Sequence, residues 1–211
     1  MIIMQQETLK TGTTTVGILF KDGVILASES KSTMGWLVAS KTSQKIYPVD
    51  EKIAVTTAGG AGDTQALIRI VKAEINLYKI TRNAEFTVKA ATSLLSNILS
   101  NNRYYPYMAM LIVGGFDRDG PHLWSVDAVG GAEEEKSFTA TGSGSPVAFG
   151  VLENDYKENM TKDEAVRLAV RSIRSARERD VMSGGKEINV TVITKDGMEQ
   201  ISQEKTKELA K

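Results

Sequence analysis

Three consecutive threonines, Thr13 to Thr15, follow Gly12 near the start of the chain and open a β-rich run. A threonine at a chain start carries a hydroxyl and a free α-amine, and so forms a nucleophile with its own base. Thr13 gains that amine only if the bond after Gly12 is cut. The first hypothesis is therefore a hydrolase that cleaves itself at Gly12–Thr13 and releases residues 1–12 as a propeptide, leaving 13–211 as one catalytic domain.

Two charged residues lie at the end of the strand that returns beside the threonines. The Asp-Gly pair at residues 22–23 predicts a hairpin whose paired residue numbers sum to about 44 or 45. This register places Lys31 opposite residues 13–14 and Glu29 opposite residues 15–16. Strand periodicity also puts both side chains on one face, where a carboxylate can hold a nearby amine or hydroxyl and change its proton affinity.

Lys45 is the next candidate, because it opens the run Lys-Ile-Tyr-Pro-Val and so can reach the same end of a sheet as Thr13. An ammonium there would stabilise a threonine alkoxide. It would also lower the proton affinity of the terminal amine, whose reference pKa of about 7.7 to 8.0 suits a general base. A plain surface lysine is the alternative.

A glycine-rich stretch, Ala-Gly-Gly-Ala-Gly-Asp at residues 58–63, joins a predicted strand to a predicted helix. Closely spaced glycines leave backbone N–H groups free to face an oxyanion or a phosphate. The stretch lacks the lysine and hydroxyl residue of a P-loop, which makes nucleotide binding the weaker interpretation. A tight helix entry without a ligand is the other.

Composition narrows the chemistry further. The 211 residues include 26 Lys and Arg, 26 Asp and Glu, no cysteine and one histidine, His122. Disulfides and thiolate chemistry are excluded, and a serine–histidine–acid triad would have to use His122, which we expect to be an exposed strand-end residue. No run is apolar and long enough to span a membrane, and no single-sign block suggests nucleic acid. We expect a cytoplasmic chain that needs no metal or other cofactor.

Turn signals and hydrophobic periodicity predict the order of the elements. Asp-Gly pairs at residues 22, 119 and 196 mark three hairpins, and a fourth turns near residue 50. Helical patterns cover residues 62–81, 84–101, 146–156 and a stretch after Thr161, which begins a capping box. Several strands are apolar on both faces, so their sheets must be covered on both sides. The fold class predicted is α+β, a four-layer αββα sandwich.

Five short motifs resemble the catalytic β subunits of the archaeal type of proteasome, within the N-terminal nucleophile hydrolases. They are GTTTVGI at residues 12–18, AGGAGD at 58–63, LLSNIL at 94–99, TGSGSP at 141–146 and RDVMSGG at 179–185. The resemblance runs from Gly12 nearly to the C-terminus. It implies a threonine endopeptidase that degrades unfolded polypeptides inside a barrel.

The resemblance also implies roles for individual residues. Thr13 resembles the nucleophile, Lys45 its activating cation and Glu29 the acid paired with that lysine. The remaining residues that the resemblance assigns to catalysis are Asp180, Ser143 and Ser183 around the terminal amine and Gly59 as oxyanion donor. Those that it assigns to peptide binding are Thr33 and Ala61 through their backbones, with Ser32, Ser43, Tyr47, Thr57 and again Ala61 lining the specificity pocket.

Two residues depart from the family pattern, which often has aspartate in place of Glu29 and arginine in place of Lys31. Glutamate keeps the charge with one more methylene, so we expect function to survive. Lysine lacks the planar fork that arginine uses for two parallel hydrogen bonds.

The partners implied are further copies of this chain in a homo-heptameric ring, rings of a separate α subunit, and a regulatory ATPase that acts through the α ring. Two other functions stay open from the residues alone. One is a non-catalytic ring subunit, although such a chain would usually lack Gly12–Thr13 or Lys45. The other is a phosphate-binding module built on residues 58–63.

Overall fold

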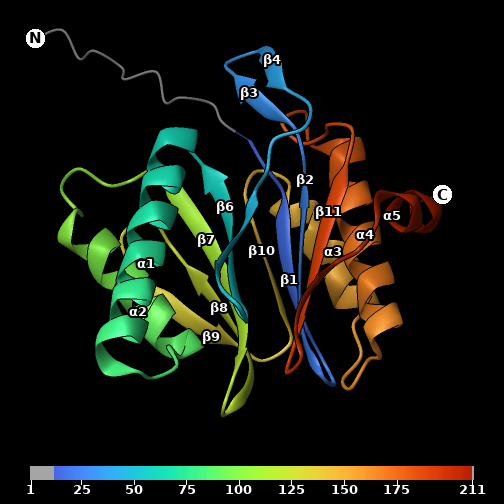
Figure 1. The fold of residues 1–211 in the computed structure, drawn as a ribbon. Helices are drawn as coiled ribbons and strands as arrows, with labels where there is room; N and C mark the ends of the chain where they lie inside the picture. Colours follow the sequence, from blue (N-terminus) through green and yellow to red (C-terminus); the bar gives the residue numbers. More distant parts are fainter. Residues whose placement is uncertain (1–11, 211) are drawn as a thin grey trace, which may run out of the picture.

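Two five-stranded antiparallel sheets lie face to face, and helices cover the outer side of each (Figure 1). This computed structural model describes residues 12–210. The first sheet contains, in spatial order, β10 (Phe138–Thr141), β1 (Thr15–Phe20), β2 (Gly23–Glu29), β11 (Ile188–Thr194) and β12 (Gly197–Gln200). The second contains β5 (Ile46–Asp50), β6 (Ile53–Gly59), β7 (Ala109–Asp117), β8 (Gly120–Val126) and β9 (Ala132–Glu135).

The helices form the two outer layers. The second sheet is covered by α1 (Ala61–Arg82) and α2 (Val88–Asn101), and the first by α3 (Ser145–Asp155), α4 (Lys162–Arg179) and the short α5 (Gln203–Leu209). A small hairpin of β3 (Ser32–Met34) and β4 (Leu37–Ser40) projects beyond the sheets at the top of Figure 1. The predicted αββα sandwich is confirmed.

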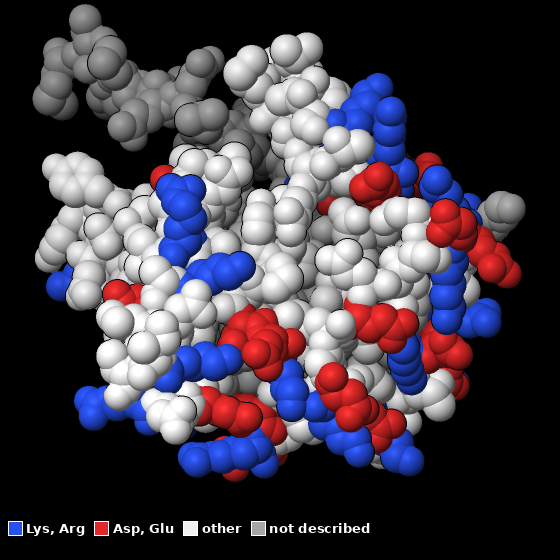
Figure 2. Space-filling view, in the orientation of Figure 1, with Lys and Arg blue, Asp and Glu red and all other residues white. Residues whose placement is uncertain are grey.

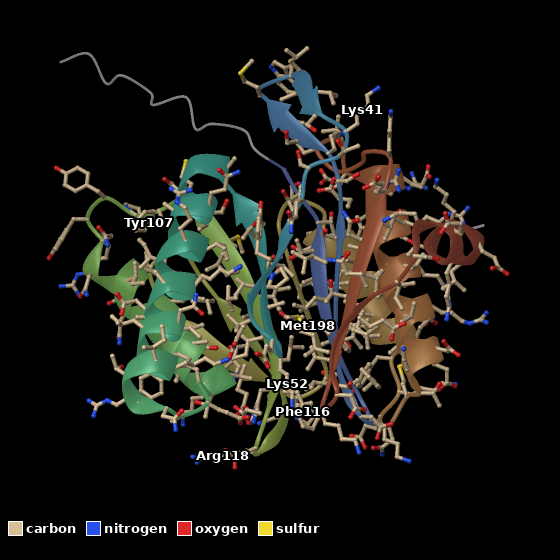
Figure 3. All side chains as sticks on the ribbon, in the orientation of Figure 1. Lys41, Lys52, Tyr107, Phe116, Arg118 and Met198 are labelled. Atoms are coloured by element: carbon tan, nitrogen blue, oxygen red, sulfur yellow. The ribbon has the colours of Figure 1, made fainter. Side chains whose placement is uncertain are left out.

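Three apolar clusters separate the four layers. One joins the first sheet to α3 and α4, and another joins the second sheet to α1 and α2. The third lies between the sheets and is built on residues such as Leu26 and Ile112, with Phe116 and Met198 packed against it (Figure 3). Strands apolar on both faces are thus explained, because each sheet buries one face against helices and the other against its partner sheet.

The predicted helix start after Thr161 is confirmed in detail. The Thr161 side chain accepts a hydrogen bond from the backbone of Glu164, and the Glu164 carboxylate accepts one from the backbone of Thr161. This capping box satisfies two backbone N–H groups at the helix start. Helix α2 begins later than predicted, at Val88, because Thr87 caps it by accepting from Ala90 N–H.

The predicted hairpins form, but the register of the first was wrong. Thr15 pairs with Ser28, so paired numbers sum to 43, and Glu29 N–H donates to the carbonyl of Thr14. The reason is the position of the turn. Its two loop residues are Lys21 and Asp22, and the glycine already belongs to the return strand. In this register Glu29 lies opposite Thr14 and not opposite residues 15–16. Since side chains alternate between the two faces of a sheet, a shift of one residue changes which side chains of the neighbouring strand share a face with Glu29.

His122 is not the exposed strand-end residue that we expected. It lies within β8, and its imidazole is 2.8 Å from Glu134 Oε1 and 3.4 Å from Asp117 Oδ1. Its ring is only about a quarter exposed, at 23%. Over the face of the molecule seen in Figure 2, charged side chains of both signs are intermixed and form no patch of one sign.

Candidate active site

Thr13 and Lys45 meet where the two sheets come together. Thr13 lies two residues before β1 in the first sheet, and Lys45 lies immediately before β5 in the second. Both are buried. The Nζ atom of Lys45 donates a hydrogen bond to Thr13 Oγ1 over 2.9 Å. The Lys45 backbone is held by Thr57, whose N–H donates to the Lys45 carbonyl.

Glu29 lies beneath this pair at the end of β2 and is fully buried. Its Oε1 accepts a short hydrogen bond from the Lys45 ammonium. Its Oε2 accepts from Lys31 N–H over 2.6 Å and from Gly184 N–H over 3.0 Å. These donors compensate the carboxylate for the loss of water.

Burial lowers the pKa of the Lys45 ammonium below its usual value, and the Glu29 carboxylate opposes that effect. The Lys31 cation nearby lowers the Lys45 pKa further. A lysine with a reduced proton affinity, hydrogen-bonded to a hydroxyl, can give up or take back a proton more readily than a surface lysine.

A second group of polar side chains surrounds the backbone nitrogen of Thr13. That N–H donates to Ser143 Oγ over 3.2 Å, and the Ser143 hydroxyl donates to Asp180 Oδ2 over 2.6 Å. Ser183 donates to the same carboxylate oxygen over 2.6 Å. Asp180 stands at the C-terminal end of α4, and Ser143 precedes α3, so the two helices of one layer bring this group together.

Gly12 remains joined to Thr13 in this structure, whereas the rest of the predicted propeptide, residues 1–11, lies outside the described residues. The Thr13 hydroxyl donates to the carbonyl oxygen of Gly12 over 2.7 Å. The hydroxyl is therefore close to the bond whose cleavage the sequence predicts.

Gly59 faces the same space from the end of β6. Its φ angle is +129°, and a Cβ atom there would lie 2.0 Å from the carbonyl oxygen of Met108. Only glycine fits on both counts. The neighbouring Gly60 N–H is occupied by Met108 O, and Asp63 places a carboxylate beside the loop, which makes the loop unsuitable for a phosphate.

A cavity of about 710 Å³ opens beside Thr13. All six predicted peptide-binding residues line it, as do Gly12, Thr13, Lys45 and Gly59. The other lining residues are Ala39, Gln44, Thr64, Gln65, Ile68 and Arg69. Burial raises the pKa of the Tyr47 phenol, so it stays neutral at physiological pH, and it donates to the carbonyl of Gln44 over 2.8 Å.

The structure also reveals neighbours that sequence reasoning missed. Thr14 Oγ1 lies 2.6 Å from Ser183 Oγ, which links the second threonine to Asp180. Arg69 and Gln65 reach the cavity because they share a helix face with Ala61, at spacings of eight and four residues. This helical spacing could have indicated both residues from the sequence. No sequence pattern indicated that Met182 packs against Gly12.

Two negative findings apply to residues 12–210. None of the helices there is long and apolar enough to cross a membrane. Nor does that part of the chain contain a group of three or more histidine, aspartate or glutamate side chains placed to hold a metal ion.

An αββα sandwich with a threonine just before β1, and with a buried lysine hydrogen-bonded to its hydroxyl, defines the class of N-terminal nucleophile hydrolases. Sequence comparison places the chain within that class. The sequence pattern of the family described as "Proteasome subunit" matches residues 9–193. The chain belongs to this family, as a proteasome β subunit, a threonine-type endopeptidase of the core particle.

Three relatives illustrate how far the similarity extends, and each is named proteasome subunit beta. The chain is 54% identical to that of Methanoregula boonei over 96% of its own length and 95% of the relative's. It is 53% identical to that of Methanosphaerula palustris over 95% and 94%, and 49% identical to that of Methanosarcina thermophila over 97% of both.

Proposed function

We propose that Thr13 is the nucleophile of this endopeptidase and that the chain prepares it by cutting itself after Gly12. The observation that carries the proposal is the hydrogen bond from Lys45 Nζ to Thr13 Oγ1, made by a buried lysine that is itself paired with Glu29. A cation held in this way stabilises a threonine alkoxide. It cannot move away, because Glu29 anchors its ammonium.

Self-cleavage begins when Thr13 Oγ1 attacks the carbonyl carbon of Gly12. The C–N bond then breaks, the nitrogen takes a proton, and an ester joins Gly12 to the threonine oxygen. Water hydrolyses the ester, which releases the propeptide with a new carboxylate and leaves the hydroxyl and a free amine on Thr13. Proximity supplies much of the rate, since the attacking and attacked groups belong to adjacent residues.

In the mature enzyme the same oxygen attacks a peptide carbonyl of the substrate. The α-amine of Thr13 accepts the hydroxyl proton, directly or through water, and passes it to the leaving amine. Ser143, Asp180 and Ser183 orient that amine through their shared hydrogen bonds. Gly59 N–H stabilises the oxyanion, and water then hydrolyses the acyl-enzyme.

Peptide binding in the cavity follows from the same arrangement. Thr33 and Ala61 offer backbone groups to an extended substrate, and Ser32, Ser43, Tyr47 and Thr57 surround the side chain next to the scissile bond. The substrates proposed are unfolded polypeptides, because only an extended chain brings its backbone to these groups.

The chain belongs to a core particle, and we infer its finer organisation from the family resemblance. Copies of this subunit form a homo-heptameric ring, rings of α subunits enclose the β rings, and an ATPase delivers substrate through the α ring. The cytoplasm is the compartment proposed, in keeping with a chain that contains no cysteine.

The test combines intact mass and peptide hydrolysis on the assembled particle. Wild-type β subunits should lose residues 1–12 and hydrolyse peptides. Thr13→Ala should keep the propeptide and hydrolyse none, whereas Thr13→Ser, which keeps a hydroxyl, should retain both reactions. Hydrolysis by particles whose β subunits all still carry Met1 would overturn the proposal.

A further inference from the structure

One face of helix α1 forms a wall of the cavity. Its lining residues are Ala61, Thr64, Gln65, Ile68 and Arg69, which recur at the three- and four-residue spacing of a single helix face. The wall begins beside Gly59, where the oxyanion would lie. It ends at Arg69, about 12 Å further along the helix axis at 1.5 Å per residue.

The charged residues that line this cavity are of one sign. Among the lining residues within the described range, only Lys45 and Arg69 are charged, both are cations, and none is a carboxylate. Lys45 already has Glu29 as its partner. Arg69 is exposed and makes no ion pair or side-chain hydrogen bond with any residue in the described range 12–210. The guanidinium therefore remains available to an anion that enters the cavity.

The direction of the helix lets Arg69 act on what the cavity holds. Side chains on an α-helix tilt toward its N-terminus, which here is the end beside Gly59 and Thr13. The length of the arginine side chain lets it extend from this position toward the site of attack. Gln65 and Tyr47 add neutral polar groups along the way, and neither offers a competing anion.

We propose that Arg69 makes this cavity select an acidic side chain, glutamate above all, on the substrate residue whose carbonyl Thr13 attacks. The inference rests on the proposed function, because it takes Thr13 as the point of attack. Arginine suits the task since its planar guanidinium can donate two parallel hydrogen bonds to a carboxylate. Glutamate is favoured over aspartate because its extra methylene reaches further along the wall.

The experiment measures kcat/KM of the assembled particle for four fluorogenic peptides that differ only in the residue before the scissile bond: glutamate, glutamine, leucine or arginine. Arg69→Gln should lower the value for the glutamate peptide about tenfold, the size expected for one charge-assisted contact, and change the glutamine and leucine values less than twofold. Arg69→Glu should lower the glutamate value further and raise the arginine value.

Arg82→Gln is the matched control, since Arg82 lies in the last turn of the same helix and does not line the cavity. It should leave all four values unchanged. The glutamate preference of the wild type should also shrink in about 1 M salt, where charges are screened within about 3 Å.

The two proposals fail in different ways. If Arg69→Gln leaves the ratio of glutamate to leucine cleavage unchanged while Thr13→Ala abolishes both, the specificity proposal is wrong and Thr13 remains the nucleophile. If Thr13→Ala still cleaves the leucine peptide at the wild-type rate, the proposed function itself fails.

Discussion

A Cβ atom on Gly12 would lie 1.7 Å from the Cβ of Met182. The space beside the Gly12 carbonyl is therefore closed to any side chain while Met182 stays in place. Ser143 Oγ also lies 2.8 Å from the same point. The residue in front of Thr13 is held against the group that surrounds its nitrogen, and only glycine fits there.

Gly12→Ala should therefore slow release of the propeptide by at least tenfold, because the alanine methyl must push the Gly12 carbonyl away from Thr13 Oγ1. Intact mass over time after assembly measures the processed fraction. A second substitution identifies the obstacle. Met182→Gly removes the clashing atom and should partly restore processing of Gly12→Ala, whereas Met182→Ala keeps the Cβ and should not. Equal rescue by both would contradict the steric explanation.

Gly59→Ala should reduce peptide hydrolysis by about a hundredfold or more, the cost of losing one oxyanion donor. The added methyl would lie 2.0 Å from Met108 O at a φ of +129°, so the backbone must move. Gly120→Ala is the control, since Gly120 has a similar φ of +112° and open space around its Cβ position. Both variants should unfold at lower temperature, but only Gly59→Ala should lose hydrolysis.

The capping box of α4 should give the chain a stability that depends on pH. A hydrogen bond from the Thr161 backbone, joined by one from its side chain, lowers the pKa of Glu164 in the folded chain. The Glu164 carboxyl therefore holds its proton more tightly in the unfolded chain than in the folded chain. The stabilisation is complete at a pH above the unfolded pKa of about 4.3, and it is lost as the pH falls through the pKa of Glu164 in the folded chain.

Thermal unfolding of the purified chain tests this dependence. At pH 7, Glu164→Gln should melt a few degrees below wild type, and the gap should close below about pH 4. Glu158→Gln serves as the control, because it removes an exposed carboxylate from the loop just before the helix. A gap for Glu164→Gln that stays constant from pH 7 to pH 3 would show that its charge is not involved.

Much of the fold could be predicted from the sequence because its signals were local. Asp-Gly pairs, the Thr161 cap and helical periodicity each depend on a few adjacent residues. The register of the first hairpin could not be predicted, since Asp-Gly does not say which residues occupy the loop. Here Gly23 is required in the strand, where a Cβ would lie 2.1 Å from Ile193 O, an atom far away in the chain.

At the candidate site, too, features set by adjacent residues were predicted, and the contacts that were missed join residues far apart in the chain. Thr13 and Glu29 lie at the ends of the first hairpin, so their approach follows from the pairing of β1 with β2. Lys45 precedes β5 in the other sheet and reaches them because the two sheets pack face to face. Their exact contacts still required the structure. The short strand β9 was missed because it is Ala-Glu-Glu-Glu, a sequence with low strand propensity that pairs only beside β8. The place of Met182 depends on the packing of α4 against the chain start.

Lys31 provides the last prediction, because it connects Glu29 to the segment that carries Asp180 and Ser183. Its Nζ donates to Val181 O over 2.7 Å, and its backbone N–H donates to Glu29 Oε2. Lys31→Ala should loosen that segment and lower kcat about threefold to tenfold with little change in KM. The loss is partial because Gly184 N–H still donates to Glu29.

Steady-state kinetics and hydrogen exchange of residues 180–184 measure the two effects together. Lys31→Arg should retain near wild-type kcat, since its guanidinium can reach the same carbonyl. Lys41→Ala is the control for loss of a nearby lysine, because its side chain lies at the base of the projecting hairpin (Figure 3). If Lys31→Ala raises KM and leaves both kcat and exchange unchanged, Lys31 contacts substrate and does not position Asp180 and Ser183.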